Sequence, residues 1–407
     1  MKRGVETRVI AAGLLRRILD EGAYSNVVIR TGTQDLSRRD VLFVQRLVYT
    51  AIRYLGRIDR AIDAEISRPI DEVVRRVLRI GVAEILFTDT EPHAAVDSAV
   101  EAVRVLDAPR ASGFVNAVLR NVVRHGEPDL PAGVEGDALR YGVPSWLFDN
   151  LVHAYGDDAT RAFLEASNRP TRVGVRRRSG EPPGESARGI ENAFLVDDVS
   201  EHREAIESGV LVIADPASTA AAAALEPRSG DRVLDLAAAP GGKSLQLWDR
   251  IGGDGLVIAM DRHPRRSASA QRRLERMGVR IPWVIGNAAE PPFPPASFER
   301  VLLDAPCTGL GTLRRRPEIR HRLDKDSAVE AGRLQRSMLE AALDLVRPGG
   351  RLVYSVCTVT PEETVDVVVG LDAYAPLNLP GARLNGGLLL APHLTQSDGM
   401  FIAVIDR

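Results

Sequence analysis

The spacing of apolar residues changes part-way along the chain, and this change constrains the fold most. From Glu6 to Val123 apolar residues recur at the three- and four-residue intervals of helices, with no strand-like alternation. From Val210 onward, short apolar runs alternate with helical stretches, at Leu211–Ile213, Val233–Leu236, Leu256–Met260, Val301–Leu303 and Arg351–Ser355. Such alternation predicts a doubly wound α/β sheet. The sequence therefore predicts an all-α domain followed by an α/β domain.

The stretch between these two patterns has a mixed character. Residues 125–141 are rich in Pro, Gly and Asp, which is typical of a linker. Residues 141–209 combine a helical piece, the strand-like Arg172–Arg176 and a Pro/Gly-rich loop, which predicts a small α+β module. The expected organisation is a helical domain at 1–128, a small α+β module at 141–209 and an α/β domain at 210–407.

Length and composition exclude several classes of protein. A chain of 407 residues with 44% hydrophobic residues is long enough for two or three well-packed domains. Two cysteines are too few for a disulfide framework, and no Cys/His cluster has metal-ligand spacing, so no metal site is expected. No segment approaches the roughly 20 apolar residues of a membrane span. We expect a cytoplasmic protein.

Positive charge is nearly all arginine, although the net charge is −2. Arginines cluster at Arg176–Arg178, Arg262–Arg276 and Arg314–Arg316. Runs of charge occur on ordinary solvated surfaces as well as at nucleic-acid interfaces, so both interpretations stay open.

A loop of small residues follows the first predicted strand of the α/β domain. It reads Asp-Leu-Ala-Ala-Ala-Pro-Gly-Gly-Lys-Ser from Asp235 to Ser244. Small residues let a backbone approach a ligand, and the next helix offers its N–H groups to an anion. The loop lacks the glycine orders of dinucleotide folds and P-loops, so the carboxylate of S-adenosylmethionine is the expected anion. Asp261, 26 positions after Asp235, stands where such folds bind ribose hydroxyls, although it could instead cap the next helix.

Both thiols follow predicted strands on the expected ligand side. Cys307 comes after Leu303-Asp304-Ala-Pro, and Cys357 comes after Tyr354-Ser-Val. A cysteine is often only a small hydrophobic residue. At these strand ends, however, neighbouring arginines and backbone N–H groups would favour a thiolate, so we predict that both thiols are functional.

Three motifs together resemble one family. Ala-Ala-Pro-Gly-Gly-Lys, Asp-Ala-Pro-Cys-x-Gly-x-Gly-x-x-Arg-Arg and Tyr-Ser-x-Cys-x-x-x-Pro-Glu-Glu, in this order, resemble the Sun/Fmu family of bacterial 16S ribosomal RNA cytosine-C5 methyltransferases. The N-terminal domain, ending in Phe114-Val-Asn-Ala-Val-Leu-Arg, resembles the NusB-like RNA-binding domain of the bacterial branch. The resemblance implies a Rossmann-like methyltransferase domain, an RNA-binding role for the middle module, and S-adenosylmethionine as cofactor.

The resemblance also implies the site. Catalytic roles fall on Cys357, Cys307 and Asp304. Cofactor contacts fall on Ala237, Ala238, Ala239, Pro240, Gly241, Gly242, Lys243, Asp261, Asn287 and Asp304. Asn287 departs from the family, which usually has an aspartate there, so contact with the adenine amino group is expected to differ. The expected partner is 16S ribosomal RNA not yet assembled into the subunit, bound by a monomer.

Cytosine carbon 5 is a poor nucleophile, so a thiolate must first add to carbon 6. Release of the product then needs removal of the carbon-5 proton, a second task suited to a second thiol. Sequence chemistry alone does not assign the two cysteines. The family pattern assigns the nucleophile to Cys357 and product release to Cys307, with Asp304 binding the cytosine edge. The target must be single-stranded or flipped out.

Two other functions are alternatives to the predicted cytosine-C5 methyltransferase. A non-catalytic RNA-binding or ribosome-assembly factor could retain the methyltransferase fold, but the two thiols argue against it. Methylation of an amino group would favour an Asn/Asp-Pro-Pro-aromatic loop, where this chain has Asp304-Ala-Pro-Cys307.

Overall fold

The computed structural model describes residues 3–106 and 108–407, so the first two residues of the predicted helical domain and residue 107 lie outside the described part. The chain forms two compact units. One contains the residues up to Val152 and the separate segment Arg315–Arg322, and the other contains His153–Arg314 and Leu323–Arg407. The second unit thus holds most of the predicted α+β module together with the α/β domain. Within the described ranges, no helix is long and apolar enough to cross a membrane.

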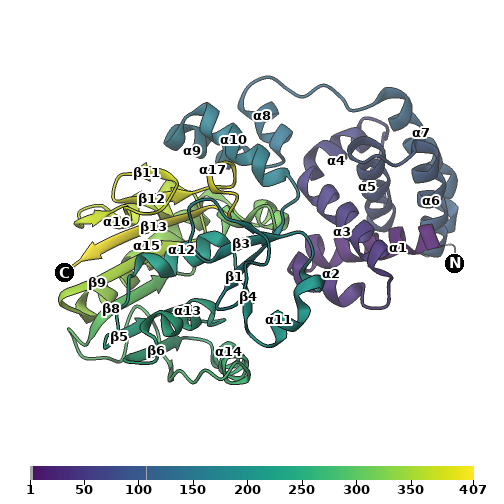
Figure 1. Cartoon of the computed structure of the whole chain (residues 1–407). Coiled ribbons are helices and arrows are strands. Elements are labelled where there is room, and N and C mark those ends of the chain that lie inside the picture. Colours follow the sequence, from purple (N-terminus) through teal and green to yellow (C-terminus); the bar gives the residue numbers. More distant parts are fainter. Residues whose placement is uncertain (1–2, 107) are drawn as a thin grey trace. The chain divides into compact units, whose positions relative to one another are not determined.

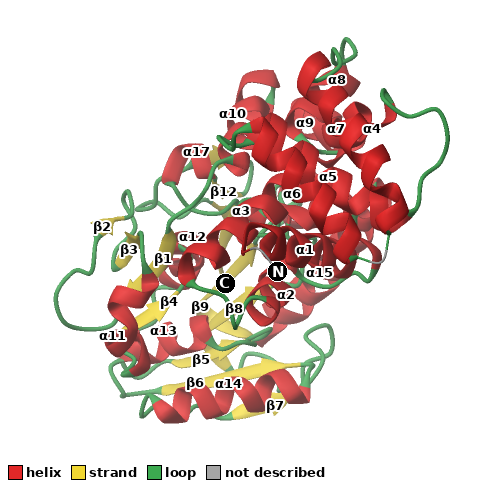
Figure 2. Ribbon diagram, turned by 90° about the vertical axis from the view of Figure 1, so that its right-hand side faces the viewer, coloured by secondary structure: helices red, strands yellow, loops and turns green. Residues whose placement is uncertain are grey.

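The first unit is built of helices around one apolar core, which confirms the all-α prediction (Figure 2). One helix of this unit starts after Ser37, whose Oγ accepts a hydrogen bond from Asp40 N (3.3 Å). The helices are α1 (Arg3–Leu15), α2 (Ser25–Gly32), α3 (Arg38–Arg53), α4 (Leu55–Asp63), α5 (Glu72–Phe87), α6 (Pro92–Val105), α7 (Ser112–His125) and α8 (Val134–Tyr141), with the start of α9 (Ser145–Tyr155).

Helix α8 corrects the prediction that residues 125–141 are only a linker. Gly133 (φ 76°) precedes the helix and Gly142 (φ 70°) ends it in the left-handed conformation. Ala138 buries its side chain, with 1% exposed. Glycines at both ends gave this segment a loop-like composition, although they serve as the boundaries of a short helix.

The segment Arg315–Arg322 belongs to the helical unit, although it directly follows the loop that contains Cys307 in the other unit. Glu318 is buried, and its carboxylate accepts hydrogen bonds from Ser25 N (3.0 Å) and Ser25 Oγ (2.7 Å) at the start of α2. Arg320, also buried, donates to Tyr141 O (2.9 Å), and His321 Nε2 lies 2.8 Å from Ile52 O. The sequence prediction placed this segment wholly within 210–407.

A four-stranded antiparallel sheet of order β2-β3-β1-β4 begins the second unit. Its strands are β1 (Val173–Arg177), β2 (Glu185–Ser186), β3 (Ala193–Val196) and β4 (Leu211–Ile213). Strand β4 was predicted to belong to the doubly wound sheet. It pairs instead with β1, Val175 opposite Ile213, because the edge of the small sheet supplies its hydrogen-bond partners.

The large sheet has the order β11-β12-β13-β9-β8-β5-β6-β7, with β10 (Ala373–Tyr374) also paired to β13 (Figure 1). Its strands are β5 (Arg232–Asp235), β6 (Leu256–Asp261), β7 (Trp283–Ile285), β8 (Phe298–Asp304), β9 (Val346–Val356), β11 (Ala382–Leu384), β12 (Gly387–Leu390) and β13 (Met400–Asp406). Strands β5 to β9 are parallel, which confirms the predicted doubly wound core.

The chain order of these strands positions the site. From β5 the chain builds outward through β6 and β7, then returns to add β8 and β9 on the other side of β5. Ligands in such sheets bind beyond the carboxyl ends of the strands, at the point where the order reverses. Asp235 ends β5 and Asp304 ends β8, so both acids stand at this edge. Helix α12 (Pro216–Ala224) precedes β5, whereas α13 (Gly242–Ile251), α14 (Pro264–Arg276) and α15 (Lys325–Leu345) follow β5, β6 and β8.

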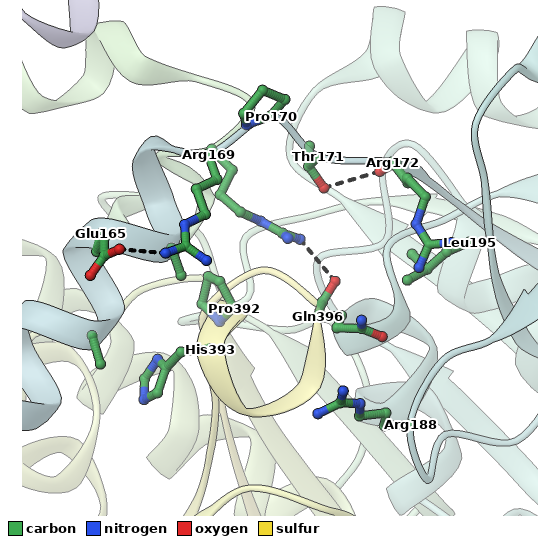
Figure 3. A pocket seen from close by; sticks show the side chains of 13 residues that line it. Glu165, Arg169, Pro170, Thr171, Arg172, Arg188, Leu195, Pro392, His393 and Gln396 are labelled. Atoms are coloured by element: carbon green, nitrogen blue, oxygen red, sulfur yellow. Dashed lines mark hydrogen bonds and ion pairs between the residues drawn. The ribbon is translucent and has the colours of Figure 1, made fainter.

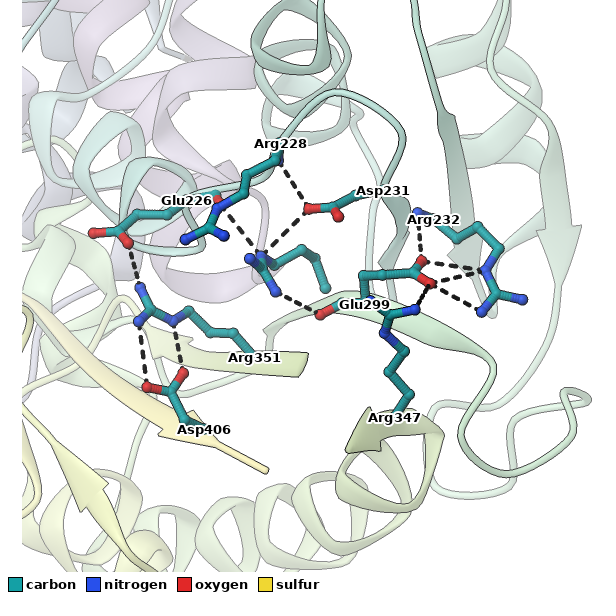
Figure 4. Close-up of polar contacts among 9 residues, drawn as sticks. Glu226, Arg228, Asp231, Arg232, Glu299, Arg347, Arg351 and Asp406 are labelled. Carbon is teal, nitrogen blue, oxygen red and sulfur yellow. Dashed lines mark hydrogen bonds and ion pairs between the residues drawn. The ribbon is translucent and has the colours of Figure 1, made fainter. Parts of the chain in front are cut away.

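The opposite edge of the sheet carries a network of ion pairs (Figure 4). Glu299 at the start of β8 binds Arg232 and Arg347, each at 3.0 Å. Arg351 of β9 binds Asp406 at the end of β13 (2.8 Å). These pairs tie neighbouring strands together where the parallel strands begin, away from the edge expected to bind ligands.

Candidate active site

The loop after β5 folds back across the carboxyl ends of its neighbours. Leu236 N donates to Leu302 O (2.9 Å) of β8, and Ala238 N donates to Met260 O (2.8 Å) of β6. Gly241 (φ 86°) precedes α13 in the left-handed conformation that glycine adopts without strain. A side chain at Gly242 would meet nothing within 4 Å, so the backbone at the start of α13 is open to a ligand.

Two buried acids stand beneath this loop. Asp261 accepts hydrogen bonds from Ala239 N (3.0 Å) and His263 N (2.8 Å). The residue preceding α14 is His263, so the alternative role of Asp261 as the cap of that helix is wrong. Burial raises the pKa of Asp235 to about 7, although Ser244 Oγ donates to its Oδ2 (2.6 Å). Oδ1 of Asp235 accepts no hydrogen bond from any residue in the described ranges.

These features fit the cofactor that the loop predicts. An open helix start suits a carboxylate, an acid after β6 suits ribose hydroxyls, and a buried acceptor without a partner is ready for a donor. Asn287 lies just beyond β7 at the same edge, exposed, with its Oδ1 accepting from Ala289 N (3.2 Å).

Lys243 and Asp304 form an ion pair across the site. Lys243 Nζ lies 2.7 Å from Asp304 Oδ2, and Ser355 Oγ donates to Asp304 Oδ1 (2.8 Å). Burial would lower the pKa of Lys243, but the neighbouring Asp304 carboxylate outweighs it, so the pKa is raised. The structure thus places Lys243, which was predicted to contact the cofactor, in direct contact with Asp304, which was predicted to be catalytic.

The two cysteines meet, as their strand positions predicted. Cys307 Sγ lies 3.3 Å from Cys357 Sγ. Hydrogen bonding between the thiols raises the pKa of Cys307 and lowers that of Cys357. Burial opposes the second shift, and the Lys243 ammonium favours it. The pKa shifts therefore favour ionisation of Cys357 over ionisation of Cys307, although the nearby Asp304 carboxylate opposes a charge on either thiol.

A buried glutamate that the sequence interpretation gave no role joins the two cysteine loops. Glu363 is 0% exposed. Its Oε1 accepts from Thr308 N (2.8 Å), next to Cys307, and its Oε2 accepts from Thr358 Oγ1 (3.0 Å), next to Cys357. Thr360 Oγ1 (2.9 Å) and Gln335 Nε2 (3.0 Å) also donate to this carboxylate. The signal was present in the Pro-Glu-Glu sequence that closes the second cysteine motif.

Close backbone packing also holds the Cys307 loop. Gly311 N donates to Cys357 O (3.0 Å), and Gly399 N donates to Gly311 O (2.8 Å). A side chain at Gly311 would lie 2.0 Å from Gly399 O, so only glycine fits. This explains one of the two glycines after Cys307 on physical grounds.

Two residues of the first arginine run are held by one carboxylate. Arg176 is buried and pairs with Asp249 (2.9 Å), and Arg178 pairs with the same carboxylate (2.7 Å). Their guanidinium groups hold β1 to α13, a structural role that the run of charge did not predict. In the third run Arg314 is buried and Arg315 and Arg316 are exposed.

A doubly wound sheet with a cofactor loop after its first strand and an acid after its second defines a domain that binds a ribose-bearing cofactor. Residues 222–406 match the model of the family described as 16S rRNA methyltransferase RsmB/F, and residues 5–124 match that of the NusB family. Residues 222–406 therefore form a domain of this methyltransferase family, and residues 5–124 ahead of it form a domain of the NusB family. The predicted resemblance is confirmed.

Relatives match nearly the whole chain. The ribosomal RNA small subunit methyltransferase B of Vibrio vulnificus is 29% identical, covering 98% of this chain and 99% of the relative. That of Escherichia coli O139:H28 is 28% identical and covers 99% of both. Among solved structures, PH0851 superposes with a TM-score of 0.83 at 24% identity over 100% of this chain and 99% of its own. A methyltransferase homologue from Pyrococcus horikoshii has a TM-score of 0.57 at 24% identity, covering 68% of this chain and 99% of its own. The two structures support the fold.

Proposed function

We propose that this enzyme transfers a methyl group from S-adenosylmethionine to carbon 5 of a cytosine in 16S ribosomal RNA, with Cys357 as covalent nucleophile. The observation that carries the proposal is the thiol pair. The lowered pKa of Cys357 supplies the thiolate that attack on carbon 6 requires.

In the proposed reaction, each step moves electron pairs between named atoms. The Cys357 thiolate forms a bond to carbon 6, and the electron pair of the 5,6 double bond moves to carbon 5. Carbon 5 would then form a bond to the sulfonium methyl of S-adenosylmethionine, and the electron pair of the broken carbon–sulfur bond would stay on that sulfur, which leaves as the thioether S-adenosylhomocysteine. Loss of the carbon-5 proton to a base then restores the double bond as the bond between sulfur and carbon 6 breaks.

In this proposal Cys307 assists the release step. Its sulfur lies 3.3 Å from Cys357 Sγ, so a thiolate formed there would act beside the adduct. Asp304 receives the cytosine edge, because each of its carboxylate oxygens accepts one bond from the protein and has capacity for another. It would accept from the exocyclic amino group of the cytosine.

The cofactor is bound, in this proposal, by Ala237 to Lys243, with Asp261 on its ribose and Asn287 near its adenine. The helical unit binds RNA, the substrate is rRNA before assembly, and the enzyme acts as a monomer. A ribosomal RNA substrate would place it in the cytoplasm.

The test measures methyl transfer from labelled S-adenosylmethionine to naked 16S rRNA. Cys357→Ala should abolish 5-methylcytosine, and Cys307→Ala should accumulate a denaturant-resistant protein–RNA adduct. An adduct in Cys357→Ala and none in Cys307→Ala would exchange the two roles. The absence of 5-methylcytosine with wild type on every RNA tried would overturn the proposal in favour of a binding factor.

A further inference from the structure

A pocket of about 490 Å³ lies in the second unit, apart from the thiol site (Figure 3). Its walls come from the end of α10 (Asp157–Asn168), the linker that leads into β1, the loop between β2 and β3, and α17 (Pro392–Thr395). No catalytic or cofactor role has been assigned to these segments. The volume is in the range of pockets that hold a small ligand or a nucleotide-sized group.

The lining is strongly basic. It contains four arginines, Arg169, Arg172, Arg188 and Arg314, against one carboxylate, Glu165. Arg169 pairs with Glu165 on the surface, and Arg172 pairs with Glu185 (2.8 Å), which is also exposed. Exposed pairs of this kind contribute little stability, so an incoming anion can replace the carboxylates at small cost. Figure 3 shows no interaction for Arg188 with the other residues drawn.

Arg314 connects this pocket to the catalytic loop. It lies seven positions after Cys307 and is buried, with its guanidinium donating to Gln396 O (3.1 Å) and 3.5 Å from Asp398. Gly399, three residues beyond Gln396, is bonded to Gly311 of the same loop. The pocket wall and the Cys307 loop are therefore parts of one hydrogen-bonded assembly.

We propose that this pocket binds backbone phosphates of the RNA strand beside the target cytosine. The inference rests on the proposed function and names a strand-binding site for it. Guanidinium groups match phosphate oxygens in paired hydrogen bonds, and a single-stranded target needs its flanking backbone held while the base is in the site. His393 and Gln396 add groups suited to sugar or base contacts.

The test uses the full-length enzyme with Arg169→Ala and Arg188→Ala combined. The matched control combines Arg203→Ala and Arg280→Ala, which removes two exposed arginines of the same unit outside the pocket and outside the arginine clusters. Loss of two phosphate contacts should weaken single-stranded RNA binding about twentyfold at roughly 0.1 M salt and reduce the salt slope by about 1.4. The control pair should bind RNA as the wild type does, and both should bind S-adenosylmethionine unchanged.

A second measurement locates the phosphates. An oligonucleotide is made around the methylated cytosine, once mapped, with neutral methylphosphonates at the flanking positions. The substitution should weaken binding to wild type and have little further effect on the pocket variant. Equal losses in both proteins, or an unchanged salt slope in the variant, would overturn the inference.

Two further outcomes separate the hypotheses. If polyglutamate binding depended on the pocket arginines and RNA binding did not, the pocket would be a protein-docking site and the proposal would fail. If wild type formed no 5-methylcytosine but RNA affinity still depended on the pocket, the strand site would stand without the proposed reaction.

Discussion

At the scale of single residues, the proposed reaction depends on which of two adjacent thiols keeps its proton. Cys307 and Cys357 have the same side chain and the same kind of strand-end position. The hydrogen bond between them raises the pKa of Cys307 and lowers that of Cys357. Glu363 adds to the first shift and the Lys243 ammonium adds to the second, whereas Asp304 raises the pKa of both thiols.

This division predicts a pH effect. The pKa of Cys357 is lowered, so its thiolate is present below the pH at which an ordinary thiol ionises, and alkylation by iodoacetamide should remain fast toward neutral pH. Cys307→Ala removes the hydrogen-bond donor, so the midpoint of the alkylation profile should move to higher pH. Mass spectrometry of the alkylated peptide measures the rate at each pH. An unmoved midpoint would mean that Lys243, and not Cys307, sets the ionisation.

Glu363 is predicted to be a positioning residue. Glu363→Gln keeps the size but replaces an acceptor of several hydrogen bonds by an amide, which leaves at least one buried hydroxyl without its partner. The free energy of unfolding, measured in urea, should fall by about 2 kcal/mol. The enzyme's kcat should fall by a larger factor than KM changes.

Glu340→Gln provides the control for this variant, since Glu340 is an exposed partner of Arg336 on α15. It should leave both quantities unchanged. A Glu363→Gln enzyme with normal kcat and lowered stability would make Glu363 a structural residue only.

At the scale of elements, the segment Arg315–Arg322 is the least expected part of the fold. It contributes a buried acid to the start of α2 and a buried arginine to the end of α8. The two charges also act on each other, because Arg320 is buried near Glu318, and burial lowers the pKa of this arginine to about 9.

Glu318→Ala should therefore destabilise the helical unit by about 3 kcal/mol, since it removes two hydrogen bonds to Ser25 and leaves Arg320 without a neighbouring negative charge. Hydrogen exchange of the intact chain should show faster exchange in α2 and α3. Glu330→Ala on the exposed surface of α15 is the matched change. Equal exchange in the two variants would contradict a role for the segment in holding these helices.

At the scale of the whole molecule, the chain consists of two compact units with separate apolar cores. The proposed cofactor site lies entirely in the second unit, since its loop, acids and thiols all belong to β5, β6, β8 and β9 or to the residues that follow them.

S-adenosylmethionine should accordingly stabilise only the second unit. At 100 times its Kd, it should raise the free energy of opening there by about 2.7 kcal/mol. Hydrogen exchange should slow in β5 and β6, while α5 and α7 exchange as before. Equal protection of α5 would show that the two units unfold together.

The elements of both units could be predicted because their signals are local. Apolar spacing indicated the helices and most strands, and the order of loop, acid and thiols along the chain indicated the chemistry of the site. Two short elements were not predicted correctly. The composition of α8 resembled that of a loop, and the apolar run of β4 was compatible with either of the two sheets.

The sequence by itself determined the fold class, the small-residue loop after β5 and the position of two thiols just beyond strand ends, because each depends on residues close together in the chain. Only the tertiary structure decided that the two thiols are in contact, that Glu363 joins both cysteine loops, and that Arg176 and Arg178 pair with Asp249. It also assigned Arg315–Arg322 to the helical unit. These outcomes depend on burial and on partners far away in the sequence, and local patterns contain neither.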